Sequence, residues 1–214
     1  MSLVDDFVKR HYKKIRPFRF VYGWAKDAAT KAQASARAEE WKQKDFKGAK
    51  LDICGGRNPF KPGEFLNVDI VPFPSVDLVF DITKTFPIPT GVIAEVFSAA
   101  TLEHLRQPQN LHVLREFYRI LMPGGIVRIS TPDVEAIARA LLAGEDLQIV
   151  NQHFFGKFKE NQTEDFDVHR WMYPVKEMIA VLRQIGFTDV EQIPMDVGLH
   201  DERFNYLVRA RKPV

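Results

Sequence analysis

Apolar and polar positions divide the chain into two regions with different periodicities. From Val4 to Ile15 apolar residues recur at helical spacing, and the stretch Val21–Lys44 is rich in good helix formers. After Lys50, short apolar runs alternate with amphipathic stretches. This change predicts a helical extension over residues 1–49, followed by an α/β domain over residues 50–214.

The second region predicts a layered sheet. Seven apolar runs indicate strands, at Leu51–Cys54, Phe65–Ile70, Leu78–Asp81, Val92–Ser98, Gly125–Ser130, Val190–Ile193 and Phe204–Arg209. Between them, one-sided apolar patterns predict helices at Gln109–Leu121, Val134–Ala143 and Val175–Ile185. Alternating strands and helices favour a doubly wound, mainly parallel sheet. Ligands of such sheets bind beyond the carboxyl ends of the strands, where the strand order reverses.

Composition narrows the class of protein. Cys54 is the one cysteine of the chain, which excludes an internal disulfide and a cysteine-based zinc site. No apolar run approaches the roughly 20 residues of a membrane span, and the first residues do not resemble a secretory signal. We therefore expect a cytoplasmic protein.

Charge is unevenly distributed along the chain. Residues 1–50 contain 13 Lys and Arg against 6 Asp and Glu, whereas the remainder contains 17 against 22. A basic extension on an acidic domain is able to dock on nucleic acid or a phospholipid surface. A solvated helix face explains the same counts, so both interpretations stay open.

Three features indicate a nucleotide-type cofactor site. Asp52 lies in the first strand, which runs into Gly55 and Gly56, and glycines allow close approach of a ligand. Asp69 ends the second strand, where an acid typically binds ribose hydroxyls, and Asp81 ends the third. Taken singly, paired glycines are most often a turn, and a lone aspartate is most often a helix cap or a turn residue.

Together with later segments, these residues resemble the class I S-adenosylmethionine-dependent methyltransferases. The matching segments read LDICGGRNP, NVDI, VDLVFDIT, FSAATLEHL, REFYRILMPGGIVRISTPD and LRQIGF. Their order and spacing are similar to the methyltransferase type 11 subgroup. The resemblance covers roughly Lys50 to Arg211. It implies a seven-stranded sheet with an antiparallel last strand, and bound S-adenosylmethionine.

The resemblance also implies roles for individual residues. The cofactor-binding set comprises Asp52, Gly55, Gly56, Asp69, Ile70, Asp81, Ile82, Ser98 and Ala99. Gly55 and Gly56 would lie against methionine and ribose, and Asp69 would hold the ribose hydroxyls. Ile70, Asp81 and Ile82 would contact adenine. Ser98 and Ala99 would form the loop under the methionine moiety.

Two departures from the family pattern concern the cofactor loop. Cys54 stands at the first glycine position, where it either narrows the loop or replaces glycine at a negative φ. The segment Arg57–Glu64 is too short and too broken by prolines for the family's usual first helix. Neither departure removes the acids on which the cofactor interpretation depends.

Residues on the acceptor side are predicted less directly. His104 and His169 are the candidate catalytic bases, because a histidine pKa lies near neutrality. Glu103, Arg170 and Tyr173 are candidate substrate residues. The segment 147–174 is predicted to be a lid or substrate wall. For each histidine a purely structural role, bonded to backbone or ordering the lid, explains the sequence equally well. The sequence predicts no metal site.

The function predicted from these residues is methyl transfer from S-adenosylmethionine to a small molecule or a saccharide or lipid-linked intermediate. An NAD-dependent oxidoreductase is disfavoured, since the glycines are not spaced as G-x-G-x-x-G. An aminopropyltransferase is disfavoured by the lack of an acidic pair suited to a polyamine. A noncatalytic binding protein of the same fold and an RNA methyltransferase using the basic extension remain alternatives. The sequence leaves the oligomeric state open.

Overall fold

A computed structural model describes residues 45–156, 167–195, 198 and 201–214. The chain divides after Lys44 into two compact units, and the second of them, Asp45–Val214, contains the sheet and every candidate site residue. The predicted helices Val4–Ile15 and Val21–Lys44 lie outside the described residues.

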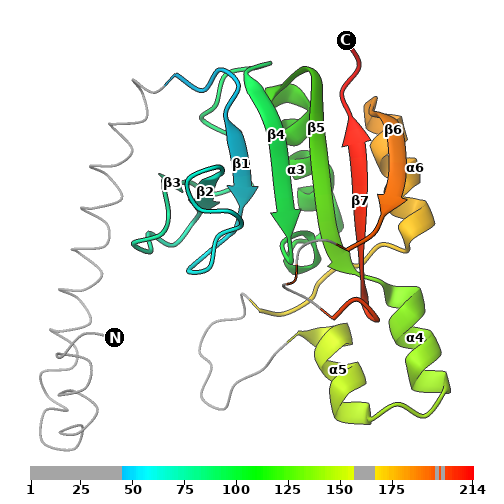
Figure 1. The fold of residues 1–214 in the computed structure, drawn as a ribbon. Coiled ribbons are helices and arrows are strands. Elements are labelled where there is room, and N and C mark those ends of the chain that lie inside the picture. Colours follow the sequence, from blue (N-terminus) through cyan, green and yellow to red (C-terminus); the bar gives the residue numbers. More distant parts are fainter. Residues whose placement is uncertain (1–44, 157–166, 196–197, 199–200) are drawn as a thin grey trace, which may run out of the picture. The chain divides into compact units, whose positions relative to one another are not determined.

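Seven strands form one sheet in the order β3-β2-β1-β4-β5-β7-β6 (Figure 1). From β1 the chain continues outward through β2 and β3 to one edge of the sheet. It then crosses back and forms the other half of the sheet, beginning with β4 beside β1. This reversal between β1 and β4 confirms the predicted doubly wound arrangement. β7 runs antiparallel to both β5 and β6, while the other described pairs are parallel, as predicted.

The strands are β1 Lys50–Ile53, β2 Leu66–Asp69, β3 Leu78–Val79, β4 Ile93–Ala99, β5 Leu121–Pro132, β6 Thr188–Ile193 and β7 Asn205–Arg211. The helices are η2 Leu102–His104, α3 Gln107–Ile120, α4 Val134–Leu142, α5 Leu147–Phe155 and α6 Val175–Ile185, where η2 is a 3-10 helix. β5 is longer than predicted because its pairing with β4 begins at Leu121, before the Pro-Gly-Gly bend.

The core forms where apolar strand residues meet one face of α3 and α6. Leu114 and Phe117 of α3 and Leu182 of α6 are fully buried, which is the face predicted by the helical spacing. α6 ends at Gly186, whose φ of +117° is accessible to glycine at little cost. Figure 1 shows both helices behind the sheet, where they also contact each other.

Helices α4 and α5 pack together beyond the carboxyl end of β5 (Figure 1). Ile137, Val150 and Phe204 form their shared core. α5 corrects the sequence prediction, which contains no helix between Ala143 and Val175. Asp146 caps α5 by accepting the backbone N–H groups of the second and third residues that follow it.

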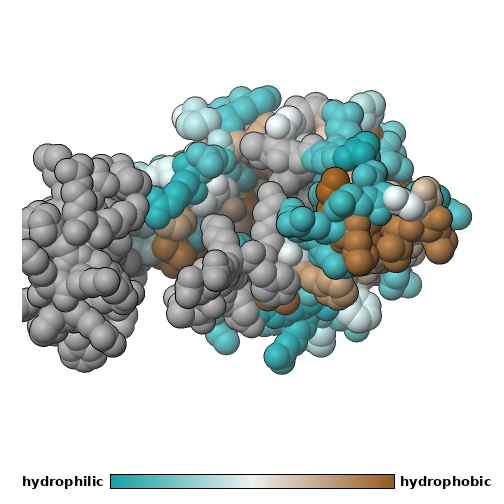
Figure 2. Space-filling view, turned by 90° about the horizontal axis from the view of Figure 1, so that it is seen from below, coloured by the Kyte–Doolittle hydropathy of each residue, from teal (hydrophilic) through white to brown (hydrophobic). Residues whose placement is uncertain are grey.

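The pair α4–α5 keeps a large part of its apolar surface exposed. Figure 2 looks onto the edge where the parallel strands end and shows a hydrophobic patch over these helices. Its exposed apolar side chains are Leu141, Leu142, Leu147, Ile149 and Phe155. Within the described residues no helix is both long and apolar enough to cross a membrane. The cytoplasmic location stays a prediction.

Candidate functional site

A small pocket lies at the carboxyl ends of β1 and β4, where the strand order reverses. Its volume is about 210 Å³. It is lined by Asp52, Cys54, Gly55, Asn58, Phe60, Phe97, Ala99 and Ala100. Several of these belong to the predicted cofactor residues or their loop, so the structure brings the β1 loop and the end of β4 together, as the fold class requires.

The loop after β1 fits only glycine at its centre. A Cβ on Gly55 would lie 2.1 Å from Asp52 Oδ2 and 2.6 Å from Asn67 Oδ1. Gly56 has a φ of +56°, and its carbonyl accepts hydrogen bonds from Asn67 Nδ2 and Ser75 Oγ. The backbone of both glycines is therefore held close to two carboxylates, those of Asp52 and of Asp69, whose Oδ2 would lie 3.8 Å from a Cβ on Gly56.

The backbone conformation of Cys54 excludes one of the two alternatives predicted for the first glycine position, namely that it replaces glycine at a negative φ. The φ of Cys54 is +61°. Ala100, across the pocket at the end of β4, also has a positive φ, of +50°. Left-handed non-glycine residues cost roughly 1–2 kcal/mol each and gather at functional sites. Both walls of the pocket therefore have strained backbone.

Two buried carboxylates give the pocket its electrostatic character. Burial, reinforced by the charge of Asp69, raises the pKa of Asp52 to about 6, although the N–H of Phe60 donates to Asp52 Oδ2 at 2.7 Å. Burial also raises the pKa of Asp69, whose Oδ1 accepts the N–H of Val71. A carboxylate has about four acceptor positions, so both side chains retain capacity for ligand hydroxyls.

The remaining predicted cofactor residues lie around this centre. Ile70 follows Asp69 and is 52% exposed, so its side chain offers an open apolar surface. Asp81 accepts from the N–H and Oγ1 of Thr83, the turn-capping role that is typical of a lone aspartate. Ile82 and Ser98 are buried, and Ser98 Oγ has no hydrogen-bond partner.

The predicted acceptor residues Glu103, His104 and His169 form one cluster. One ligand atom of each lies within 4.8 Å of those of the other two, although His169 is 65 positions from His104. The two imidazole rings meet edge to face at 5.1 Å. Glu103 and His104 belong to η2, and the longer helix α3 starts only at Gln107.

Arg170 and Tyr173 occupy structural positions beside this cluster. Arg170 Nη1 donates to the carbonyls of His104 and Val168, and the backbone N–H of Arg170 donates to the carbonyl of Glu103. Tyr173 is 1% exposed, and its carbonyl accepts from the hydroxyl of Tyr206. Their predicted contact with substrate stays a prediction.

Several residues that contribute to the site are not predicted from the sequence. The ring centroids of Phe60 and Phe97 lie 4.1 Å apart, and both residues line the pocket together with Asn58 of the glycine loop. Thr131 donates its hydroxyl to Glu103 Oε2 at 3.1 Å. Only Phe60 gives a signal in the sequence, since an aromatic residue close to a glycine loop suits a ligand wall.

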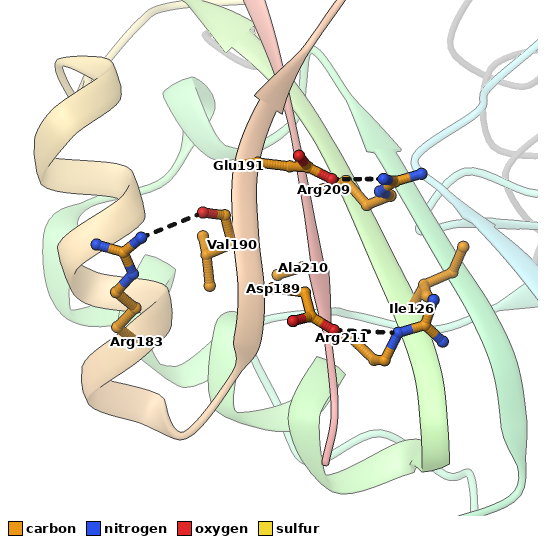
Figure 3. A pocket seen from close by; sticks show the side chains of 8 residues that line it. All are labelled: Ile126, Arg183, Asp189, Val190, Glu191, Arg209, Ala210 and Arg211. Atoms are coloured by element: carbon orange, nitrogen blue, oxygen red, sulfur yellow. Dashed lines mark hydrogen bonds and ion pairs between the residues drawn. The ribbon is translucent and has the colours of Figure 1, made fainter. Parts of the chain in front are cut away.

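Two further hollows differ in chemistry. One, of about 640 Å³, lies beside α5 and is mainly apolar, with Leu147, Phe155 and Val168 among its lining residues. The other, of about 470 Å³, lies on the β6 and β7 edge (Figure 3). There Arg209 pairs with Glu191 and Arg211 with Asp189, so these charges neutralise each other.

Comparisons with known proteins find solved structures of similar fold. No family model and no curated protein sequence matches the chain. A methyltransferase of Methanosarcina mazei, named as S-adenosylmethionine-dependent, is 13% identical with a TM-score of 0.52, and the match covers 78% of this chain and 93% of that chain.

Two other solved structures are similar to the same degree. The S-adenosylmethionine-dependent methyltransferase SibL is 22% identical with a TM-score of 0.51, over 80% of this chain and 53% of SibL. The chain therefore spans about half the length of SibL. A chain of the Haloferax volcanii complex between the Trm112 methyltransferase activator and a putative methyltransferase is 16% identical with a TM-score of 0.50. The match covers 90% of this chain and 97% of that chain. The strand order, the reversal at β1 and β4 and these neighbours show that the domain has the fold of the class I S-adenosylmethionine-dependent methyltransferases.

Proposed function

We propose that this protein transfers a methyl group from S-adenosylmethionine to a small acceptor. The observation that carries the proposal is the position of the Asp69 carboxylate beside the Gly55–Gly56 loop, at the strand ends where the sheet order reverses. An acid at the end of the second strand is the group that binds ribose hydroxyls in cofactor sites of this topology.

The residues present fit the cofactor. Gly55 and Gly56 leave the backbone uncovered toward the methionine and ribose portions, and Asp69, which accepts the backbone N–H groups of Gly56, Ile70 and Val71, keeps an acceptor position for a ribose hydroxyl. Ile70 supplies an exposed apolar surface for adenine, with Asp81 and Ile82 following β3. Ser98 and Ala99 end β4 under the methionine moiety, and Ala99 lines the pocket.

Pocket size indicates how the cofactor is distributed. About 210 Å³ is less than the roughly 300 Å³ at which small-molecule sites begin. The pocket therefore suits the methionine portion, while the adenosine portion lies outward along Asp69 and over Ile70. The ammonium group of the methionine portion would complement the buried carboxylate of Asp52, which lines this pocket.

The chemistry needs mainly alignment. S-adenosylmethionine supplies a methyl group activated by a sulfonium. A lone pair of the acceptor forms the new bond to the methyl carbon, the carbon–sulfur bond breaks, and its electron pair stays on sulfur, while the acceptor's proton leaves to a base or to water. Holding the two reactants in line contributes roughly 7–11 kcal/mol of barrier lowering.

The acceptor side is proposed to be the cluster of Glu103, His104 and His169. Burial, with a smaller contribution from the neighbouring His104, lowers the pKa of His169 to about 4, so this imidazole is neutral at pH 7 and retains a lone pair. The mainly apolar hollow beside α5 lies next to this segment through Val168. Its lining favours an acceptor with an apolar portion, such as a lipid-linked intermediate.

The proposal is tested by the affinity for S-adenosylhomocysteine. Isothermal titration calorimetry of the wild type and Asp69→Asn should show a loss of about 10- to 100-fold in the variant, because hydrogen bonds to a charged group contribute roughly 1.5–3 kcal/mol. Glu202→Gln, which changes an exposed acid outside the pocket, is the control and should bind like the wild type. Equal affinity of Asp69→Asn and wild type would refute the ribose assignment.

A further inference from the structure

Three metal-ligating side chains from two separate segments converge on one point. One atom each of Glu103, His104 and His169 lies within 4.8 Å of the other two. Ligands at about 2.0–2.2 Å from a tetrahedral ion lie roughly 3.4 Å apart, so the three atoms would approach one another by up to about 1.4 Å on binding an ion.

Both imidazoles are oriented by backbone carbonyls. His169 Nδ1 lies 2.8 Å from the carbonyl of His153, and His104 Nδ1 lies 3.3 Å from that of Val168. A carbonyl only accepts, so each Nδ1 carries the proton and each Nε2 keeps its lone pair. Histidines that ligate metals almost always donate their other ring N–H to such a partner, which fixes the tautomer.

The carboxylate of Glu103 has an environment that a cation would complete. The residue is 2% exposed, and Thr131 Oγ1 donates to its Oε2. Burying a carboxylate is costly unless it is paired, and coordinating a metal offsets that cost.

Backbone contacts hold the two halves of the cluster together. The carbonyl of Glu103 accepts the N–H groups of Arg170 at 2.6 Å and Trp171 at 3.3 Å. Arg170 Nη1 donates to the carbonyl of His104 at 2.7 Å. The segment that carries His169 is thus tied to η2 at several points, so the three side chains are positioned before any ion arrives.

We propose that Glu103, His104 and His169 bind one divalent transition-metal ion. Two imidazoles and one carboxylate suit Zn²⁺, and three protein ligands leave a position open for water or another oxygen ligand. Mg²⁺ prefers oxygen ligands and should bind much more weakly.

The position of this site suggests the chemical class of the acceptor. Ala100 lines the cofactor pocket, and the neighbouring Thr101 donates its hydroxyl to the carbonyl of Ile53 at the end of β1, so η2 with Glu103 and His104 begins at the edge of that pocket. Resting on the proposed methyltransferase function, the open position would receive a hydroxyl oxygen of the acceptor.

The experiment is a calorimetric titration of the full chain with Zn²⁺ after chelator treatment, with Mg²⁺ as the comparison ion. One Zn²⁺ per chain is expected. His104→Gln, His169→Gln and Glu103→Gln should each weaken binding by more than about 100-fold, since even loss of a residue that orients a ligand costs 10- to 100-fold. His112→Gln, on α3, replaces an imidazole outside the cluster and should bind Zn²⁺ normally.

Circular dichroism melts identify variants that fail to fold. The two histidine variants keep the test decisive if the buried Glu103→Gln does not fold. No bound Zn²⁺, or equal binding in folded variants and wild type, overturns the site. Parallel titration with S-adenosylhomocysteine separates the two proposals. Binding of Zn²⁺ alone supports the metal site and refutes the methyltransferase function. Binding of S-adenosylhomocysteine alone supports the methyltransferase function and refutes the metal site.

Discussion

Asp52→Asn should stabilise the protein at neutral pH. Asp52 is 3% exposed, and its pKa is raised from 3.8 to about 6 by burial, with the charge of Asp69 adding to the effect. An asparagine has nearly the same shape and its amide oxygen can accept the N–H of Phe60. The substitution therefore removes the ionisation while keeping the hydrogen bond.

The magnitude follows from the shift. A rise from 3.8 to about 6 is about two pKa units, and each unit corresponds to about 1.36 kcal/mol, so the ionised form costs the folded state roughly 3 kcal/mol. The folded state binds the proton more tightly, so stability of the wild type is lost as pH rises from about 4 to 6. Over the same pH range the free energy of unfolding of Asp52→Asn should rise relative to that of the wild type. Above pH 7 the variant should be more stable by about 2–3 kcal/mol.

Urea unfolding measures this difference in unfolding free energy between variant and wild type. The measurements are made at constant ionic strength, in steps of about one pH unit from about pH 4 to 8. Other titrating groups are common to both proteins and largely cancel in the difference. The gain should come with weaker binding of S-adenosylhomocysteine, because Asp52 lines the pocket. A difference in unfolding free energy that stays constant across this pH range, or a wild type more stable at its alkaline end, would refute the reasoning.

Three further substitutions, the first with Gly144→Ala as its control, test the pocket and its support. Gly55→Ala should lower the free energy of unfolding by about 3 kcal/mol and abolish cofactor binding, since its Cβ would lie 2.1 Å from a carboxylate oxygen. In the control Gly144→Ala the new Cβ meets nothing within 4 Å, so only the positive φ should count, at about 1–2 kcal/mol. Urea unfolding measures both losses. Cys54→Gly should raise the melting temperature by up to about 2–4 °C by relieving a φ of +61°, and a lower melting temperature would show that the side chain's packing dominates. Arg128→Ala should cost roughly 1–3 kcal/mol in urea, because it removes the guanidinium 2.7 Å from the buried carboxylate of Glu95 and leaves Lys50 Nζ, 3.6 Å away, as its remaining ion-pair partner; an unchanged stability would contradict this.

The elements that the sequence predicts well are those with a strong local pattern. α6 has the predicted bounds, Val175–Ile185, because its apolar face is regular and Gly186 marks the end. The short helix α5 is not predicted, since LQIVNQHFF has apolar residues on several sides and lies in a stretch without a clear period. Asp146 is its one local signal, as an N-cap.

The candidate site divides in the same way. The positions of Asp52, Gly55 and Asp69 are predictable, because each lies on a strand or in the turn after it, while their roles toward a cofactor stay predictions. The contact between His104 and His169 is not, because it depends on how residues 167–173 return to η2, which no local periodicity encodes. The positive φ of Cys54 is equally hidden, since only glycine announces such a conformation in a sequence.

The central claim is that the pocket between β1 and β4 belongs to S-adenosylmethionine. A thermal-shift titration with S-adenosylmethionine, S-adenosylhomocysteine and NAD, on protein freed of carried-over ligand, tests it most directly. At about a hundred times its dissociation constant a ligand stabilises the fold by roughly 2.7 kcal/mol, which is several degrees for a domain of this size. The account predicts that shift with both adenosyl compounds and none with NAD. No shift with either adenosyl compound, or a shift with NAD alone, would contradict it.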